Sequence, residues 1–134
     1  MTGEADLVVV GAGPGGFAAA LKARRMGLNV TLIEKYDMPG GVHTTGLQGS
    51  ANAGVGGIHT ELMAEFAAAG CIYTASEKTH PDWAGNPLSH YEKNLEPGSK
   101  FSRSSFDPKI AGRVMATMLD EAGVEVMYRT SLVE

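Results

Sequence analysis

Six consecutive residues near the start of the chain, 11–16 with the sequence GAGPGG, have the types and the spacing that a pyrophosphate site needs. Gly11 permits a tight turn, Gly13 leaves no side chain between the backbone and the phosphates, and Gly16 lets a helix pack close to a strand. A helix that begins here directs free amide groups and the positive end of its dipole at the phosphates. Taken alone, the pattern is also compatible with a glycine-rich turn that binds nothing.

An acidic residue at a suitable distance favours the binding interpretation. Glu34 lies 23 residues after Gly11 and ends an apolar run. This is near the spacing at which an acid accepts hydrogen bonds from the ribose of a dinucleotide. A carboxylate at this position repels the 2′-phosphate of NADP, so FAD or NAD is expected. The residues therefore predict a dinucleotide site.

The elements around these residues predict a strand–helix–strand unit. Residues 7–10 are apolar and mostly β-branched, which is typical of a strand buried on both faces of a parallel sheet. Residues 17–26 are rich in helix formers, and Gly27 is a common residue just after a helix. Residues 29–34 predict a second buried strand. The glycines thus lie between a strand and a helix, as a dinucleotide-binding βαβ unit requires.

The remaining chain is less regular. Residues 39–57 are glycine-rich and predict a loop, and 58–69 predict a helix closed by a glycine. Residues 71–104 have no clear period and predict an irregular excursion with short strands at most. The pair Asp107-Pro108 predicts the start of a helix that ends at Gly123.

A third strand is expected at 124–128. The fold class is therefore α/β, with a parallel sheet flanked by helices, in which we expect strand 7–10 to be central and strand 29–34 to lie beside it.

Length and composition exclude several classes of function. The chain has 134 residues, of which 43% are apolar and 19% charged, as in ordinary globular domains. The net charge of −4, with no basic run, argues against binding to nucleic acid. No apolar run approaches the ~20 residues that cross a bilayer. A secretory signal has basic residues before its apolar run, and none precedes the first apolar run here. We expect a cytoplasmic protein that does not bind a membrane.

Cysteine and histidine do not predict a metal site. The single cysteine, Cys71, excludes an internal disulfide, and its apolar neighbour favours a small buried residue over a redox thiol. The four histidines, His43, His59, His80 and His90, lack the spacing of metal ligands.

Several stretches resemble one family. Residues 8–20 are similar to the start of flavoproteins, where a proline in the glycine loop is common. Residues 32–35, followed by a glycine pair, are similar to them as well. Residues 40–47 (GGVHTTGL) resemble a loop of FAD-dependent oxidoreductases related to fumarate reductase and aspartate oxidase flavoproteins. Residues 105–126 resemble the helix and strand that return to the cofactor domain in that family.

The resemblance implies that residues 1–134 are the N-terminal part of a Rossmann-like FAD-binding domain, with an irregular excursion at about 71–104. FAD would be the cofactor, with its ADP part held by the GAGPGG loop and Glu34. The implied cofactor contacts are Gly11, Ala12, Gly13, Pro14, Gly15, Gly16, Glu34, Lys35, Gly40, Gly41, Val42, Thr44 and Leu132.

Members of the family continue beyond such a strand, with a substrate region and a late Gly-Asp motif, so we expect an incomplete domain. No catalytic residue is assigned. Two functions remain: the FAD-binding portion of a flavin-dependent oxidoreductase, or a non-catalytic nucleotide-binding fragment or subunit that needs a partner chain. The substrate is not specified.

His43 has two interpretations. With Thr44 and Gln48 it resembles the segment of succinate dehydrogenase-type flavoproteins in which a histidine bonds covalently to the flavin. The same loop pattern also fits relatives without this histidine. We favour a polar loop histidine near a non-covalently bound cofactor.

Overall fold

The computed structural model describes residues 4–51, 56–73 and 104–133. Most of the irregular excursion expected at 71–104 lies outside the described residues. The chain divides into two compact units, the first formed by Met1–Gln48 with Pro108–Glu134 and the second by Gly49–Asp107. Each unit is described by itself below.

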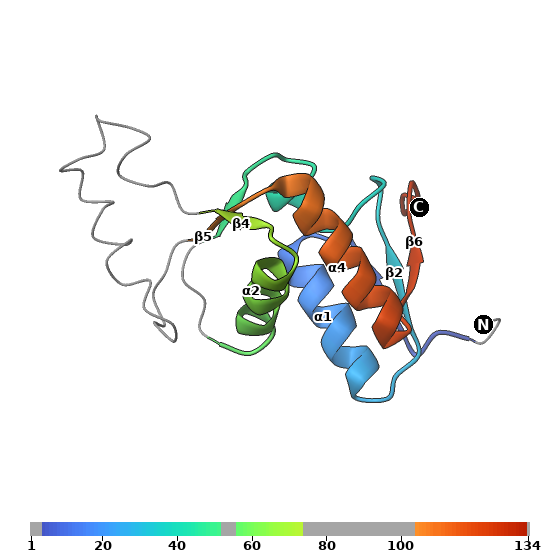
Figure 1. The fold of residues 1–134 in the computed structure, drawn as a ribbon. Helices are drawn as coiled ribbons and strands as arrows, with labels where there is room; N and C mark the ends of the chain where they lie inside the picture. Colours follow the sequence, from blue (N-terminus) through green and yellow to red (C-terminus); the bar gives the residue numbers. More distant parts are fainter. Residues whose placement is uncertain (1–3, 52–55, 74–103, 134) are drawn as a thin grey trace, which may run out of the picture. The chain divides into compact units, whose positions relative to one another are not determined.

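The first unit is an α/β structure with a parallel sheet, as the sequence predicts. Its elements are β1 (Leu7–Val10), α1 (Pro14–Arg25), β2 (Val30–Ile33), the short 3-10 helix η1 (Gly41–His43), α4 (Pro108–Ala122) and β6 (Glu125–Met127). The three strands are parallel, and α1 and α4 lie side by side against the sheet (Figure 1).

The strand order differs from the expected one. The order is β1-β2-β6, so β2 and not β1 is the middle strand among the described residues. β2 is central because Val8 pairs with Thr31 on one edge while Glu125 pairs with Thr31 on the other. The third strand therefore extends the sheet beyond β2, and β1 has a single neighbouring strand in the described part of the chain.

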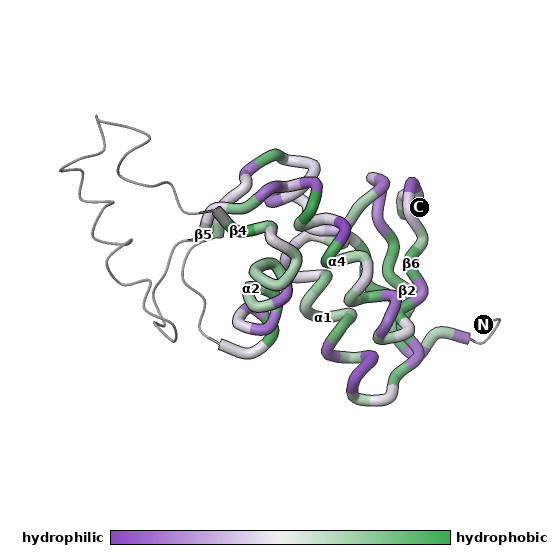
Figure 2. Tube along the Cα trace, viewed as in Figure 1, coloured by the Kyte–Doolittle hydropathy of each residue, from purple (hydrophilic) through white to green (hydrophobic). Residues whose placement is uncertain are grey.

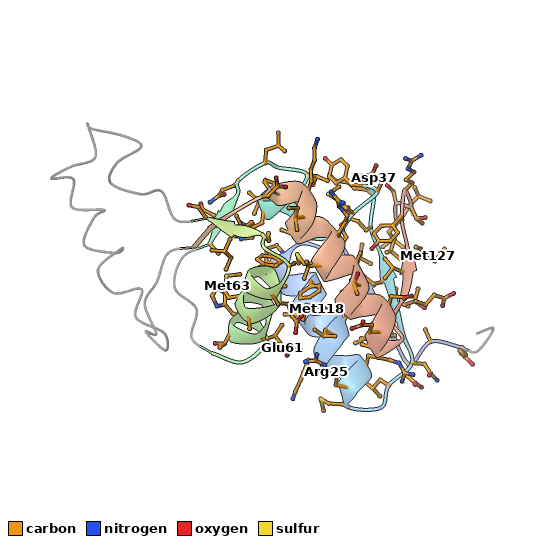
Figure 3. The ribbon with its side chains drawn as sticks, in the orientation of Figure 1. Arg25, Asp37, Glu61, Met63, Met118 and Met127 are labelled. Carbon is orange, nitrogen blue, oxygen red and sulfur yellow. The ribbon has the colours of Figure 1, made fainter. Side chains whose placement is uncertain are left out.

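The expectation that β1 is buried on both faces was also wrong for the described residues. Val8 and Val10 are 52% and 55% exposed, whereas Val30 and Leu32 of β2 are buried. Helices α1 and α4 cover one face of the sheet, and the described residues leave the other face open. Met127 lies on that open face, directed away from α4 (Figure 3).

Helix α1 begins three residues earlier than the composition indicated. Pro14 occupies its first position, where a missing N–H is harmless, and Gly13 is its N-cap. Gly27, with φ of +94°, follows the end of the helix as expected. Arg24 donates from Nε to the carbonyl of Gly123 at 3.0 Å and so joins the C-terminal ends of α1 and α4.

Helix α4 has the bounds that the sequence predicts, and one of its faces is buried. Ala111, Met115 and Leu119 are buried, while Ile110 and Val114 are only partly buried. In Figure 2 hydrophobic and hydrophilic residues alternate along α4, as expected for a helix with one buried face, whereas the hydrophilic residues of α1 gather at its C-terminal end.

The second unit has a small antiparallel sheet with the strand order β3-β5-β4. Its elements are β3 (Ser50–Ala51), α2 (Ile58–Ala68), β4 (Ile72–Tyr73) and β5 (Ser104–Phe106). The rings of Phe66 and Phe106 pack with centroids 4.9 Å apart. Cys71 is buried, as predicted, and its thiol donates to the carbonyl of Asp107 at 3.4 Å.

Candidate functional site

The GAGPGG loop forms the turn from β1 into α1. Gly11 has φ of +91°, a conformation that favours glycine, and its N–H donates to the carbonyl of Ile33 at 2.7 Å. This bond keeps the start of the turn against β2. Helix α1 then begins at Pro14, three residues after Gly11.

The glycines of this turn fall into two groups. A Cβ on Gly16 would overlap the carbonyl oxygen of Gly11, so the absence of a side chain lets the helix approach the strand. A Cβ on Gly13 or Gly15 would meet no atom within 4 Å, so these two residues face open space. The first amides of a helix have no partner within it. The open space therefore borders the free N–H groups at the start of α1.

Glu34 follows β2 and is held in place at both of its carboxylate oxygens. The side chain is only 4% exposed. Its Oε2 accepts the N–H of Ala12 at 2.7 Å, and its Oε1 accepts the N–H of Tyr36 at 2.9 Å. Each carboxylate oxygen can accept more than one hydrogen bond, so Glu34 retains the capacity to accept ribose hydroxyls.

The segment after β6 continues alongside Glu34. The N–H of Glu34 donates to the carbonyl of Met127 at 2.9 Å, and the N–H of Thr130 donates to the carbonyl of Glu34 at 3.0 Å. Arg129 has φ of +52°, and its N–H donates to the carbonyl of Tyr36. Its side chain forms an exposed ion pair with Asp37 at 3.6 Å.

Tyr128 is a residue of this region that the sequence analysis missed. Burial, and then the negative charges of Glu34 and Asp120, raises the pKa of its phenol above the ordinary value. A usable signal was present, because residues that follow neighbouring parallel strands meet at the same edge of a sheet. Tyr128 follows β6 as Glu34 follows β2.

A second glycine-containing loop contacts the first. The N–H of Gly40 donates to the carbonyl of Ala12 at 2.7 Å. A Cβ on Gly41 would lie 3.0 Å from the Cα of Gly13, so the two backbones are in close contact. Gly40 and Gly41 both have positive φ, of 107° and 52°. The structure thus brings together residues 11–16, Glu34 and this glycine pair.

The other predicted contacts have different surroundings. Thr44 is 1% exposed and donates its hydroxyl to the carbonyl of Pro39 at 2.6 Å, so its side chain stabilises the loop. The side chain of Val42 is about half exposed. Lys35 is exposed, and its ammonium lies 4.8 Å from the ring centroid of Tyr36.

Two further predicted residues of interest lie in exposed or partly exposed segments. Leu132 is exposed in the segment after β6, where its predicted backbone bonds to adenine stay a prediction. The Nδ1 atom of His43 lies 3.3 Å from the carbonyl oxygen of Gln48. Covalent attachment of flavin at His43 stays an untested alternative.

Metal and membrane sites are not indicated in the described residues. No group of three or more His, Cys, Asp or Glu side chains is placed to hold a metal ion within residues 4–51, 56–73 and 104–133. Over the same residues, no helix combines the length and the apolar character needed to cross a bilayer.

Comparison with known proteins identifies the family. A family model described as FAD dependent oxidoreductase matches residues 6–134. Digeranylgeranylglycerophospholipid reductase of Methanocella arvoryzae is 35% identical over 139 residues, which is 97% of this chain and 31% of the reductase. Dihydrolipoyl dehydrogenase of Manduca sexta is 55% identical over 40 residues, 30% of this chain and 8% of that enzyme.

Solved structures agree on the fold. The L-amino acid deaminase from Proteus vulgaris matches with a TM-score of 0.56 and 21% identity over 96% of this chain and 40% of that chain. THI4 from Thermovibrio ammonificans matches with a TM-score of 0.52 and 17% identity over 93% of this chain and 38% of that chain. The chain therefore spans well under half the length of these relatives.

Proposed function

Because the chain belongs to the FAD-dependent oxidoreductase family, whose cofactor is FAD, we propose that it holds the ADP part of FAD at residues 11–16 and Glu34. The pyrophosphate lies over Gly13 and Gly15, against the first amides of α1, and the adenosine ribose donates to the carboxylate of Glu34. A closer relation to the fumarate reductase type stays a prediction.

The observation that carries the proposal is the open space beside Gly13 and Gly15. A glycine needed only for folding has either atoms where its Cβ would be, as Gly16 has at the carbonyl of Gly11, or a positive φ, as Gly27 has. Gly13 has none within 4 Å, and its φ of −62° is accessible to any residue. Folding of the described residues thus gives no reason for a glycine here, whereas a phosphate group close to the backbone does. The residues present fit the cofactor.

The bound flavin supplies the electron-accepting chemistry, while this part of the protein supplies binding and orientation. Glu34 fixes the ribose end, and its charge disfavours a cofactor with a 2′-phosphate. Gly40 and Gly41 hold the second loop against Ala12 and Gly13, at the phosphate position. Because the chain spans 31% of the reductase relative, oxidation of a substrate is proposed for the whole protein, without a substrate class or a catalytic residue.

The test is a titration of FAD into the wild-type chain and into Gly13→Val, followed by flavin fluorescence. The valine side chain would occupy the phosphate position, so affinity should fall at least a hundredfold while the melting temperature stays close to that of the wild type. Ala19→Val, on the exposed side of α1, is the matched control and should bind FAD normally. Equal FAD affinity in wild type and Gly13→Val would reject the proposed site.

An assay of electron transfer separates the two functional classes. The bound flavin is first reduced with light and EDTA as the electron donor. A holo-chain whose reduced flavin then passes its electrons to an artificial acceptor is the FAD-binding portion of an enzyme with its redox chemistry in place. A chain that binds FAD and ADP equally well and reduces no acceptor corresponds to the nucleotide-binding module that needs a partner chain.

A further inference from the structure

The turn that follows β6 holds the backbone of Glu34 at two points. The N–H of Glu34 donates to the carbonyl of Met127 at 2.9 Å, and its carbonyl accepts the N–H of Thr130 at 3.0 Å. Because β2 and β6 are parallel neighbours, the chain leaves both strands at the same end of the sheet (Figure 1). The backbone of Glu34 is thereby fixed by a segment that lies far away in the sequence.

The side chain of Glu34 is fixed as well. Its Oε2 accepts the N–H of Ala12 at 2.7 Å, and its Oε1 accepts the N–H of Tyr36 at 2.9 Å. A carboxylate oxygen can accept about two hydrogen bonds, so each oxygen retains an acceptor position for a ligand. Since the backbone is held too, the direction of these acceptor positions depends on the shape of the turn after β6.

This turn is built around a strained residue. Arg129 has φ of +52°, in the left-handed region that is unfavourable for a residue with a side chain. Its N–H donates to the carbonyl of Tyr36 at 2.9 Å, so the turn also bonds to the segment that follows Glu34. Residues in such conformations persist only where the surrounding structure determines them, and they cluster at ligand sites.

One side chain closes the turn. The hydroxyl of Thr130 donates to the carbonyl of Tyr128 at 3.0 Å and so joins the two residues that flank Arg129. The ion pair between Arg129 and Asp37 has side chains that are 79% and 59% exposed, and a pair of this kind contributes little. The hydroxyl of Thr130 is therefore the side-chain contact best placed to keep the turn in its left-handed shape.

We infer that Thr130 is a positioning residue for ribose recognition. Its hydroxyl keeps the turn after β6 in the shape that directs the carboxylate of Glu34 at the 2′-hydroxyl of the adenosine ribose. Thr130 acts through the backbone of Glu34 and needs no contact with the ligand. This inference rests on the proposed binding of the ADP part of FAD at residues 11–16 and Glu34.

The test compares the affinities for ADP and for 2′-deoxy-ADP, which lacks the hydroxyl that Glu34 would accept, by isothermal titration calorimetry. The wild type should bind ADP about tenfold more tightly, as expected for one hydrogen bond to a charged group. Thr130→Val and Thr130→Ala both remove the hydroxyl of Thr130. In each variant the ratio should fall to about threefold or less, because a misdirected acceptor forms a weaker hydrogen bond. The affinity for 2′-deoxy-ADP should stay close to that of the wild type.

Two further variants are controls. Thr130→Ser retains a hydroxyl and should restore the wild-type ratio. Thr31→Val removes a hydroxyl that donates to the carboxylate of Glu125 at 3.1 Å within the sheet, and it should also leave the ratio unchanged. Because Thr31→Val and Thr130→Val change the same atoms, their comparison separates the loss of any threonine hydroxyl from the loss of the one that closes the turn.

Three results would overturn the inference. One is an unchanged ratio in both Thr130→Val and Thr130→Ala. Another is an equal loss of affinity for the two nucleotides, which a purely structural role would produce. The third is a loss of the ratio in Thr130→Ser as large as that in Thr130→Val, since the hydroxyl would then not be responsible. A wild-type chain that binds neither nucleotide, or binds both equally, would instead reject the proposed site at Glu34, and the inference would fail with it.

Discussion

The carboxylate of Glu34 accepts the N–H of Ala12 at 2.7 Å, so an acid at the end of β2 is bonded directly to the glycine loop. The second carboxylate oxygen accepts the N–H of Tyr36 at 2.9 Å. Glu34 is thus fixed before any ribose arrives. The arrangement preorganises the site, because the ligand meets an acceptor whose conformation is already determined.

Replacing Glu34 by glutamine should destabilise the first unit. A glutamine side chain has one oxygen and one NH₂ group, so it can accept from only one of the two backbone N–H groups and directs a donor at the other. Leaving a buried donor without a partner costs about 1–3 kcal/mol, and urea unfolding should show a loss of that size.

Glu125→Gln is the control for this prediction. The Glu125 carboxylate accepts from the hydroxyl of Thr31 at 3.1 Å at an exposed position, so the change should be close to neutral. Equal stability of Glu34→Gln and Glu125→Gln would show that the bonds from Glu34 contribute nothing to folding.

The glycines of the loop should separate into structural and binding positions. Gly16→Ala would place a methyl group on the carbonyl oxygen of Gly11, so we expect a loss of about 2 kcal/mol or more in stability. At position 13 a methyl group would enter open space, and the φ of Gly13 is unstrained. Gly13→Ala should therefore fold as the wild type does. Thermal melts of both variants are the measurement, and similar melting temperatures would contradict the assignment of separate roles.

The first βαβ unit could be predicted from the sequence because its signals are local. The apolar runs at 7–10 and 29–34 and the glycines at 11–16 each determine one element without reference to distant residues. Strand order could not be predicted, since it depends on where β6 pairs after a long separation in the chain. The burial of β1 depends likewise on what covers the second face of the sheet.

As with the fold, only part of the site could be predicted from the sequence. The glycine loop and Glu34 follow from type and spacing. The bond from Glu34 to Tyr36 required tertiary structure, because it depends on the path of a loop and not on a local pattern. Tyr128 could have been expected beside Glu34 from its place after β6, but its burial could not.

Tyr128 should make the chain sensitive to alkaline pH. Its pKa is raised in the folded state by burial and by the charges of Glu34 and Asp120, so the phenol holds its proton more tightly when folded. This contribution to stability is fully present below the ordinary tyrosine pKa of about 10 and is lost as pH rises through the folded pKa. Tyr128→Phe should remove the loss.

Melting temperatures of wild type and Tyr128→Phe between pH 8 and 11 provide the measurement, with the difference between the two proteins as the quantity of interest. Lysines and other tyrosines titrate equally in both proteins and cancel in this difference. Parallel curves for the two proteins would show that Tyr128 has no part in the alkaline loss.

The open face of the parallel sheet should promote self-association of the 134-residue chain. Val8 and Val10 of β1 and Met127 of β6 are exposed there, and β1 has a strand on one side only among the described residues. Exposed apolar residues on an edge strand favour edge-to-edge pairing. Val8→Lys should shift the chain toward the monomer with little change in melting temperature.

Size-exclusion chromatography with light scattering measures this effect. Met26→Lys adds the same charge at an exposed position outside the sheet and is the control. An equal shift in both variants would attribute the change to net charge, and no shift in Val8→Lys would show that this face does not drive association.

Binding of FAD through its ADP half can be tested by a competition experiment. FAD is bound to the wild-type chain and is then displaced, in separate titrations, by ADP, riboflavin or NADPH. We expect ADP to displace FAD completely at a single site and riboflavin not to displace it. NADPH should bind more weakly than FAD because Glu34 repels its 2′-phosphate. Displacement by riboflavin but not by ADP, or tighter binding of NADPH than of FAD, would show that residues 11–16 and Glu34 do not hold the ADP half.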